Sequence, residues 1–244
     1  MHRCYYDADI SVGCKITVEG DEAIHIARVL RLEKGDIIEI TSGNGHVYKA
    51  EIKNVAKKSI EVFITEELAI TGEPETDVTL FIGLTKGSKL ELVIQKAVEL
   101  GISSVVPVIM ERCVVKIKDE DSKTQRFRRI ASEATKQCKR SRVPYVSDPV
   151  TFEEAVEMLK NCELSFVPYE SETNTGIKAV FNGKKVKSAG FIIGPEGGFS
   201  ELEVDLLKKN SIQTVTLGKR ILRMETAAIA VLSVAMYELG EMSN

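Results

Sequence analysis

Two loops in the C-terminal half of the 244-residue chain carry residues whose types and spacing could do chemistry. The first, GPEGGFS at 194–200, follows the apolar run SAGFII and has one ionisable side chain, Glu196. Its glycines let the backbone approach a ligand closely, but their spacing matches neither GxGxxG nor GxxxxGK[ST]. A phosphate ligand would also favour a cation in the glycine loop. Glu196 therefore points away from nucleotide phosphates and toward a ligand with a positive centre.

The second loop, LGKRILRMETA at 217–227, contains Arg223 and a second carboxylate, Glu225. Both loops follow strand-like runs, as does the segment PYE at 168–170. Ligands of parallel α/β sheets bind at the carboxyl ends of the strands, so we expect the three loops to form one site. S-adenosylmethionine, with its positive centre and adenosine, suits such an acidic, backbone-lined site, although spacing alone does not identify it. Each carboxylate could instead serve only as a favourable charge at a helix N-terminus.

The elements that position these loops fall into two regions. The first seventy residues are rich in strand-like runs, with one short helix expected at about 21–30, and predict a small barrel or sandwich. The runs are DIIEIT, GHVYKAEIKNV and SIEVFITEEL. The pair Asn44-Gly45 predicts a tight hairpin turn between the first two. Because AITGEPETD has the composition of a linker, we place one domain at 1–70, the linker at 71–77 and a second domain at 78–244.

Strands and helices alternate from Val78 onward, which predicts a mostly parallel sheet covered by helices, the α/β class. A Ser or Thr three residues before a Glu predicts capping boxes at helix starts beginning with Ser88, Thr151 and Ser200. The last helix, RMETAAIAVLSVAMYELG, is rich in small apolar residues and ends at Gly240. Its stretch 227–239 is a candidate dimer interface.

The charge is unevenly distributed along the chain. The net charge of −3 argues against a uniformly basic nucleic-acid-binding protein. The segment 123–142, however, has eight Lys and Arg residues against one acid, Glu133, for a local charge of +7. An apolar stripe at helical spacing runs through it, so we expect a packed helix whose outward-facing cations could follow an RNA backbone.

Other features limit the class of protein. The five cysteines are scattered, with no CxxC pair and no nearby His cluster, so we expect reduced thiols, no disulfide framework and no bound metal. No apolar run is long enough to span a bilayer, and the first residues lack a signal-peptide core. The composition predicts a cytoplasmic protein without a membrane partner.

Six segments together resemble the ribosomal RNA small subunit methyltransferase E family. They are HIARVLRLEKGD, KLELVIQKAVELG, ERC, EATKQCKRSRVP, GPEGGFSELE and LGKRILRMETAAIAVL, in that order along nearly the whole chain. The family consists of SPOUT-type enzymes that use S-adenosylmethionine to methylate N3 of a uridine in 16S rRNA. The resemblance implies an N-terminal PUA-like β-barrel, a C-terminal α/β domain with a deep trefoil knot, and a homodimer. Its substrate would be 16S rRNA or the assembled small ribosomal subunit.

The resemblance also assigns site residues. Cofactor contacts are expected at Gly194, Glu196, Gly197, Gly198, Leu217, Gly218, Ile221, Leu222, Thr226 and Ala227. Members of the family commonly have Ser where this chain has Cys113, and a small residue, often Gly, where it has Lys139.

Methyl transfer to uridine requires near-attack geometry and loss of the N3 proton. Arg223 is the candidate for stabilising the developing uridine anion, and Glu225 is a candidate for positioning or proton transfer. The alternative is that these two side chains only pair with each other or cap the last helix.

Contacts with RNA phosphates are expected from cations outside the two loops. The candidates are Arg28, Arg31, Lys86, Lys89, Arg140 and Arg142. His25 is expected to serve packing or RNA rather than a metal. Two other functions stay open at this point: a non-catalytic RNA-binding or assembly protein, and an unrelated nucleotide-dependent α/β enzyme, which would need a cation in the glycine loop.

Overall fold

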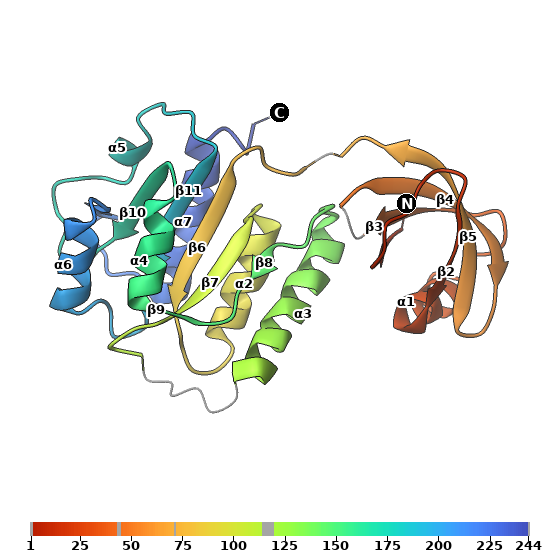
Figure 1. Ribbon diagram of the computed structural model, residues 1–244, viewed down its shortest axis with the longest axis horizontal. Helices are drawn as coiled ribbons and strands as arrows, with labels where there is room; N and C mark the ends of the chain where they lie inside the picture. Colours follow the sequence, from red (N-terminus) through yellow and green to blue (C-terminus); the bar gives the residue numbers. More distant parts are fainter. Residues whose placement is uncertain (1, 43–44, 71, 114–119, 244) are drawn as a thin grey trace. The chain divides into compact units, whose positions relative to one another are not determined.

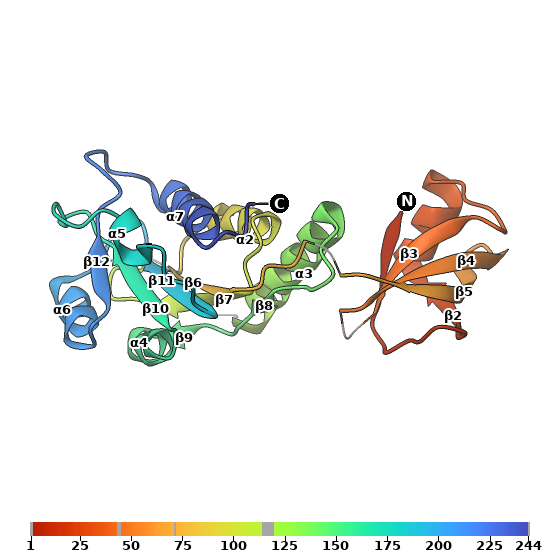
Figure 2. The ribbon, with the colours of Figure 1, turned by 90° about the horizontal axis from the view of Figure 1, so that it is seen from above.

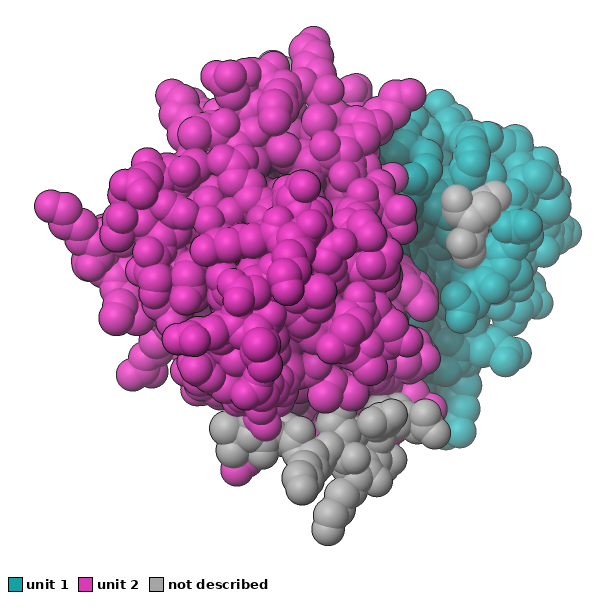
Figure 3. Space-filling view, turned by 60° about the vertical axis from the view of Figure 1, so that its left-hand side comes forward, with its two compact units in different colours: residues 1–73, 135–143 teal, residues 74–134, 144–244 magenta. Residues whose placement is uncertain are grey.

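The computed structural model describes residues 2–42, 45–70, 72–113 and 120–243, except for the side chains at 120 and 121. The chain forms two compact units (Figure 3). Unit 1 comprises residues 1–73 and 135–143, and unit 2 comprises residues 74–134 and 144–244. The short segment 135–143 thus belongs to the N-terminal unit, which the linear reading of the sequence did not include. Half of the expected hairpin turn, Asn44, lies outside the described residues.

Unit 1 is built on a five-stranded sheet with the order β1-β3-β4-β5-β2 (Figure 1). The strands are β1 (Arg3–Tyr6), β2 (Lys15–Glu19), β3 (Ile37–Ser42), β4 (Val47–Val55) and β5 (Ser59–Leu68). The three runs predicted from alternating apolar residues are β3, β4 and β5, which pair antiparallel as expected. β1 pairs in parallel with β3. Since β1 and β2 are the two edges of this order, the sheet is open there, and a closed barrel is not shown.

The short helix predicted at 21–30 is present in two pieces, α1 (Gly20–Ile24) and the π-helix η1 (His25–Val29). Ala23 and Ile26 bury its inner face in the unit 1 core, against strand residues such as Ile38 and Val62. Arg28 lies on the exposed side. Arg31 follows in a left-handed conformation, with φ 53°, which is uncommon for a residue with a side chain.

The segment 135–143 is joined to unit 1 by the Glu73 carboxylate. Glu73 accepts hydrogen bonds from Arg140 Nε at 3.2 Å and from Arg140 Nη2 at 2.8 Å. It also accepts the backbone N–H groups of Ser141 and Arg142. Burial alone would raise the pKa of Glu73, but Arg140 and the N–H donors outweigh it and hold the pKa below its usual value. Arg140 is only 6% exposed and its guanidinium is bound by Glu73 inside the fold, whereas its expected contact with RNA stays a prediction.

Lys139, next to this pair, has φ 61°. Glycine occupies that conformation without steric cost, which explains physically why a small residue suits this position.

Unit 2 contains the predicted parallel sheet. The order of its main path is β12-β10-β11-β6-β7-β8, and β9 also pairs with β7. All of the pairings are parallel. The strands are β6 (Asp77–Gly83), β7 (Ser104–Ile109), β8 (Tyr145–Val146), β9 (Val150–Thr151), β10 (Leu164–Pro168), β11 (Ser188–Ile193) and β12 (Gln213–Val215). The α/β class expected from alternating strands and helices is confirmed.

Helices cover both faces of this sheet: α2 and α7 pack together on one face, and α4 with α6 on the other (Figure 2). The helices are α2 (Lys89–Glu99), α3 (Glu120–Cys138), α4 (Phe152–Lys160), α5 (Lys178–Phe181), α6 (Glu201–Lys209) and α7 (Met224–Glu238). In the described part of the chain, no helix is both long and apolar enough to cross a membrane.

Two of the three predicted capping boxes are present. Thr151 caps α4 with Glu154, and Ser200 caps α6 with Glu203. The capping box predicted at Ser88 is wrong, because the Ser88 side chain makes no capping hydrogen bond in the described structure. Its expected partner Glu91 instead accepts a hydrogen bond from Arg126 at 2.8 Å.

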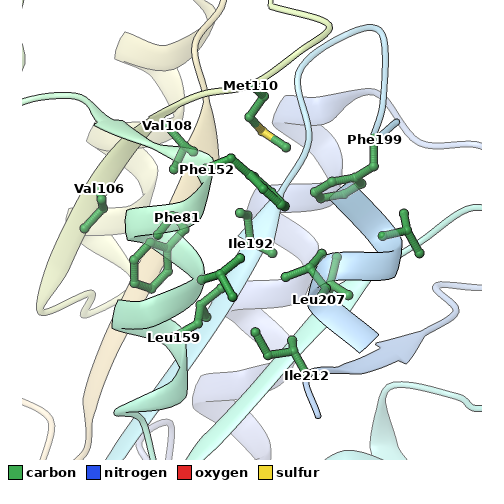
Figure 4. Close-up of a cluster of buried hydrophobic side chains, with 14 residues drawn as sticks. Phe81, Val106, Val108, Met110, Phe152, Leu159, Ile192, Phe199, Leu207 and Ile212 are labelled. Carbon is green, nitrogen blue, oxygen red and sulfur yellow. The ribbon is translucent and has the colours of Figure 1, made fainter. Parts of the chain in front are cut away.

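The core between the sheet and α4 with α6 reaches the glycine loop (Figure 4). Phe81 and Ile192 come from the sheet, Leu159 from α4 and Leu207 from α6. Phe199, which belongs to the loop 194–200, also inserts here, so the loop is fixed by core packing at one end.

We predict that Glu73→Ala lowers the local free energy of unfolding in unit 1 by about 3 kcal/mol, because it leaves Arg140 buried without a carboxylate. Hydrogen exchange of the β3, β4 and β5 amides would measure this loss of stability.

The lowered pKa of Glu73 means that the stabilisation provided by its carboxylate is present at neutral pH and is lost as the pH falls through that pKa. Glu66→Ala, which breaks an exposed contact with Lys49 at 3.9 Å, should cost at most about 1 kcal/mol. Equal effects of the two substitutions would contradict a structural role for Glu73.

Candidate active site

A cavity of about 900 Å³ opens at the carboxyl ends of β10, β11 and β12. It is lined by residues of the three loops predicted to meet there, those at 168–173, 193–199 and 216–227. The three strands are neighbours in the sheet and run parallel, so their carboxyl ends lie at one edge. Its volume is near the upper end of the range of small-molecule pockets.

The glycine loop needs its small residues for close packing. A Cβ added at Gly194 would lie 3.2 Å from the Phe199 ring. Gly198 has φ 68°, and a Cβ there would lie 3.1 Å from Glu170 Oε1, in the loop after β10. A side chain at Gly197 would meet Arg112, whose Nη1 donates to the Gly197 carbonyl at 3.1 Å. The glycines thus let the loop pass between two neighbouring loops.

A buried carboxylate, Glu203, connects this loop to the end of β7. Its Oε2 accepts the Ser200 N–H at 2.8 Å, and its Oε1 accepts the Glu111 N–H at 2.9 Å. Glu203 is 6% exposed, so these charge-assisted hydrogen bonds are shielded from water. The capping-box pattern predicted the first contact, whereas no sequence signal predicted the second.

Glu172 orders the loop after β10 in a similar way. One oxygen accepts the N–H groups of Asn174 and Thr175, and the other accepts the Thr214 hydroxyl at 2.6 Å. These hydrogen bonds, the one from Thr214 first, lower the pKa of Glu172 to about 2. Glu172 lines the cavity, although no sequence motif indicated a role for it.

The second loop forms the opposite wall and ends at α7. Gly218, Ile221 and Arg223 are exposed, and Arg223 is the residue that precedes the first turn of α7. Among the described residues, no ion pair or hydrogen bond joins the Arg223 and Glu225 side chains, so the mutual pairing considered as an alternative is not seen. Glu225 lies in the first turn of α7, where a negative charge is favoured by the helix dipole.

One oxygen of Glu225, Oε2, is buried and has no hydrogen-bond partner within the described structure. A buried carboxylate oxygen without a donor is costly, so a partner is expected to come from a bound ligand. Glu225 lines the cavity, which makes this oxygen the clearest sign of a missing polar ligand.

Most of the expected cofactor residues lie together around the cavity. Those that line it are Gly194, Glu196, Gly197, Gly198, Leu217, Gly218, Ile221, Leu222 and Ala227, with the two catalytic candidates Arg223 and Glu225. Thr226 is exposed and does not line it. Lys89, expected as an RNA contact, also lines the cavity and pairs with Glu196 at 3.1 Å.

The other cations expected to bind RNA belong to two different units. Lys86 is exposed in unit 2, while Arg28, Arg31 and Arg142 are exposed in unit 1.

The basic face of α3 is also more neutral than its sequence indicates. Arg126 pairs with Glu91, Arg128 with Asp148 and Arg129 with Glu133. Glu91 and Asp148, which lie outside the segment 123–142, therefore compensate part of its charge of +7, a value in which Glu133 is already counted.

The cavity can hold a ligand that combines apolar surface with hydrogen-bond donors. Its carboxylates offer acceptors, the loops offer backbone groups, and Arg223 offers a cation. Within the described residues, no group of three His, Cys, Asp or Glu side chains is placed to hold a metal ion.

Comparison with known proteins gives the family. The RNA methyltransferase domain profile matches residues 72–236, and the RNA methyltransferase PUA domain profile matches residues 18–65. A ribosomal RNA small subunit methyltransferase E from Bacillus subtilis is 35% identical over 91% of this chain and 90% of its own length. One from Synechocystis is 32% identical over 89% of this chain and 71% of its own length.

A crystal structure is similar throughout. The ribosomal RNA small subunit methyltransferase E from Neisseria gonorrhoeae, bound to S-adenosyl methionine, aligns with a TM-score of 0.85 and 28% identity over 97% of each chain. The fold, the two matched domains and these relatives together show that the chain belongs to the ribosomal RNA small subunit methyltransferase E family.

Proposed function

We propose that the protein uses S-adenosylmethionine to methylate N3 of a uridine in 16S rRNA of the small ribosomal subunit. The observation that carries this proposal is the cavity formed by the glycine loop and the loop 217–227, which holds a buried, unpartnered carboxylate oxygen on Glu225. The similarity to proteins named ribosomal RNA small subunit methyltransferase E, over 91% and 89% of this chain, supports methylation of this rRNA.

The residues present fit S-adenosylmethionine. The glycine loop contains no cation and offers its backbone at Gly194, Gly197 and Gly198 to an uncharged adenosine. Glu225 Oε2 would gain the hydrogen-bond donor that it lacks. When bound, S-adenosylmethionine supplies an electrophilic methyl carbon on a positively charged sulfur. The carboxylates of the cavity, among them Glu170 and Glu225, favour that charge.

Arg223 would stabilise the uridine anion that develops as N3 loses its proton. Its side chain is exposed at the cavity and has no ion-pair partner among the described residues, so the guanidinium is available to the substrate. Donors placed where charge develops act most strongly in a site from which substrate binding excludes water. Glu225 would position the ligands or accept the N3 proton, since it is the carboxylate of the same loop and one of its oxygens lacks a donor among the described residues.

One unit would bind RNA and the other would carry out methyl transfer. We infer that residues 1–70 form a PUA-like barrel that binds RNA through Arg28 and Arg31, and that residues 78–244 form the SPOUT methyltransferase domain. Arg142, which belongs to the segment 135–143 of unit 1, would add a further RNA contact. The protein would encounter 16S rRNA in the cytoplasm.

Deleting residues 1–70 should weaken rRNA binding while leaving S-adenosylmethionine binding intact, and retained rRNA affinity would contradict the assignment.

A deep trefoil knot and a homodimer complete the proposal. β12 lies beyond β10, yet α7, which follows it, packs against α2 and β11, so the chain crosses back over the sheet edge. α7 is apolar on most sides, and Ile229 and Val234 are only half-buried. An experimental structure would test the knot, and light scattering in solution would test the dimer, with a monomer contradicting it.

We predict that Gly198→Ala raises the Kd for S-adenosylmethionine roughly ten-fold, about 1.4 kcal/mol, because its Cβ would push Glu170 into the cavity. Calorimetric titration would measure it. Gly183→Ala is a matched control, since Gly183 has nearly the same φ, 69° against 68°, but lies outside the cavity and has open space around it. Both substitutions should cost some stability, and equal cofactor affinity in the two variants would contradict the prediction.

We predict that Arg223→Ala lowers kcat for rRNA methylation by about 10²- to 10³-fold while cofactor binding and thermal stability are retained. Transfer of a labelled methyl group to small subunits from a strain that lacks the gene would measure it. Arg129→Ala is the control, because Arg129 is 72% exposed in an ion pair on α3 and does not line the cavity. Full activity of Arg223→Ala would remove this residue from the mechanism.

Nucleoside mass spectrometry of the labelled product tests the position of the methyl group. The proposal expects 3-methyluridine in 16S rRNA. A methyl group at another atom would contradict the N3 assignment. A protein that binds rRNA without methylating it would favour an assembly role instead.

A further inference from the structure

The cavity has an exposed rim that carries two cations with no role assigned so far. This rim segment, Gly218–Ile221, is exposed at every residue and lines the cavity mouth. Ile221 is 89% exposed, which makes it the most exposed large apolar side chain of the described structure. Two cations, Lys219 and Arg220, lie directly before it.

These two cations are uncompensated. Neither Lys219 nor Arg220 makes an ion pair or side-chain hydrogen bond with a described residue. This distinguishes them from Arg126, Arg128 and Arg129 of α3, each of which has a carboxylate partner.

The nearby cavity carboxylates are partly engaged elsewhere. Glu196 pairs with Lys89, and Glu172 accepts the Thr214 hydroxyl and two backbone N–H groups. Since no carboxylate among the described residues pairs with Lys219 or Arg220, the rim segment carries two positive charges at the cavity lining.

We propose that the rim segment binds the phosphate backbone of the substrate RNA beside the target nucleotide. The inference rests on the proposed function and adds to it a substrate contact made by the cofactor loop itself. Lys219 and Arg220 would contact phosphates that flank the uridine, and Ile221 would contact an unstacked base or ribose. The target nucleotide would then be held by the same loop that holds the cofactor.

The charge favours RNA over a second copy of this chain as the occupant of the rim. Ile221 alone would suit either, because an exposed apolar side chain can be covered by protein or by a base. Protein interface cores are depleted of Lys, and two adjacent cations without carboxylates would be costly to bury there. An RNA backbone would instead bind more tightly because of both charges, since their contact with phosphates releases counterions from the RNA.

The test compares Lys219→Gln/Arg220→Gln with the wild-type protein. The substrates are small subunits from a strain that lacks the gene and, for binding, a labelled uridine-containing single-stranded RNA. We expect KM for the subunits to rise several-fold, with kcat and the Kd for S-adenosylmethionine unchanged. The slope of log Kd against log salt should become shallower by about 1.4, the value for two lost contacts with single-stranded RNA.

Two further variants make the test specific. Lys184→Gln/Lys185→Gln removes two adjacent exposed lysines that do not line the cavity, and it should leave KM and the salt slope unchanged. Lys219→Arg/Arg220→Lys keeps both charges and should largely restore the wild-type KM.

Several results would overturn the inference. One is an unchanged KM and salt slope in the Gln variant. Another is a loss of cofactor affinity or of self-association, which would assign the rim to the cofactor or to a second copy. If the wild-type protein binds RNA but does not methylate rRNA, the proposed function fails, while the salt slope still decides the role of the rim.

Discussion

The parallel alignment of β12, β10, β11 and β6 is the constraint on which the site depends. Because neighbouring parallel strands end at the same edge, three loops far apart in the sequence are forced to share one cavity. The loops are then held by contacts within the protein. Phe199 inserts into the core, Glu203 joins the glycine loop to the end of β7, and Glu172 joins the loop after β10 to Thr214. Such fixed walls suit a reaction whose main requirement is geometry.

Charge is separated across the cavity in a way that matches its two proposed ligands. Carboxylates and backbone groups line the interior, where a positively charged sulfur would lie, whereas uncompensated cations occupy the rim, where a polyanion would arrive. The overall charge of −3 hides this arrangement. Helix α3, which forms most of the basic segment 123–142, contributes less positive charge than expected because Arg126, Arg128 and Arg129 are paired with carboxylates.

Features that depend on local pattern were predictable from the sequence, and features that depend on distant partners were not. The strands follow from the periodicity of apolar residues. Two capping boxes follow from a Ser or Thr three residues before a Glu. The loops 194–200 and 217–227 share one cavity because their strands are parallel. The burial of Arg140 was not predictable because its partner, Glu73, lies 67 positions away. Glu172 was missed for the same reason, since Thr214 lies 42 positions away and neither residue belongs to a local motif. The knot is implied by the family resemblance, and the dimer is expected both from that resemblance and from the small apolar residues of α7.

Binding of S-adenosylmethionine to the purified wild-type protein is the most direct test of the central claim, that the loops after β10, β11 and β12 form a cofactor site. Calorimetry should show one cofactor bound per chain. Glu225→Gln, which changes the buried oxygen without changing the size of the side chain, should alter that affinity. No binding to the wild-type protein, or binding that is insensitive to Glu225, would contradict the claim.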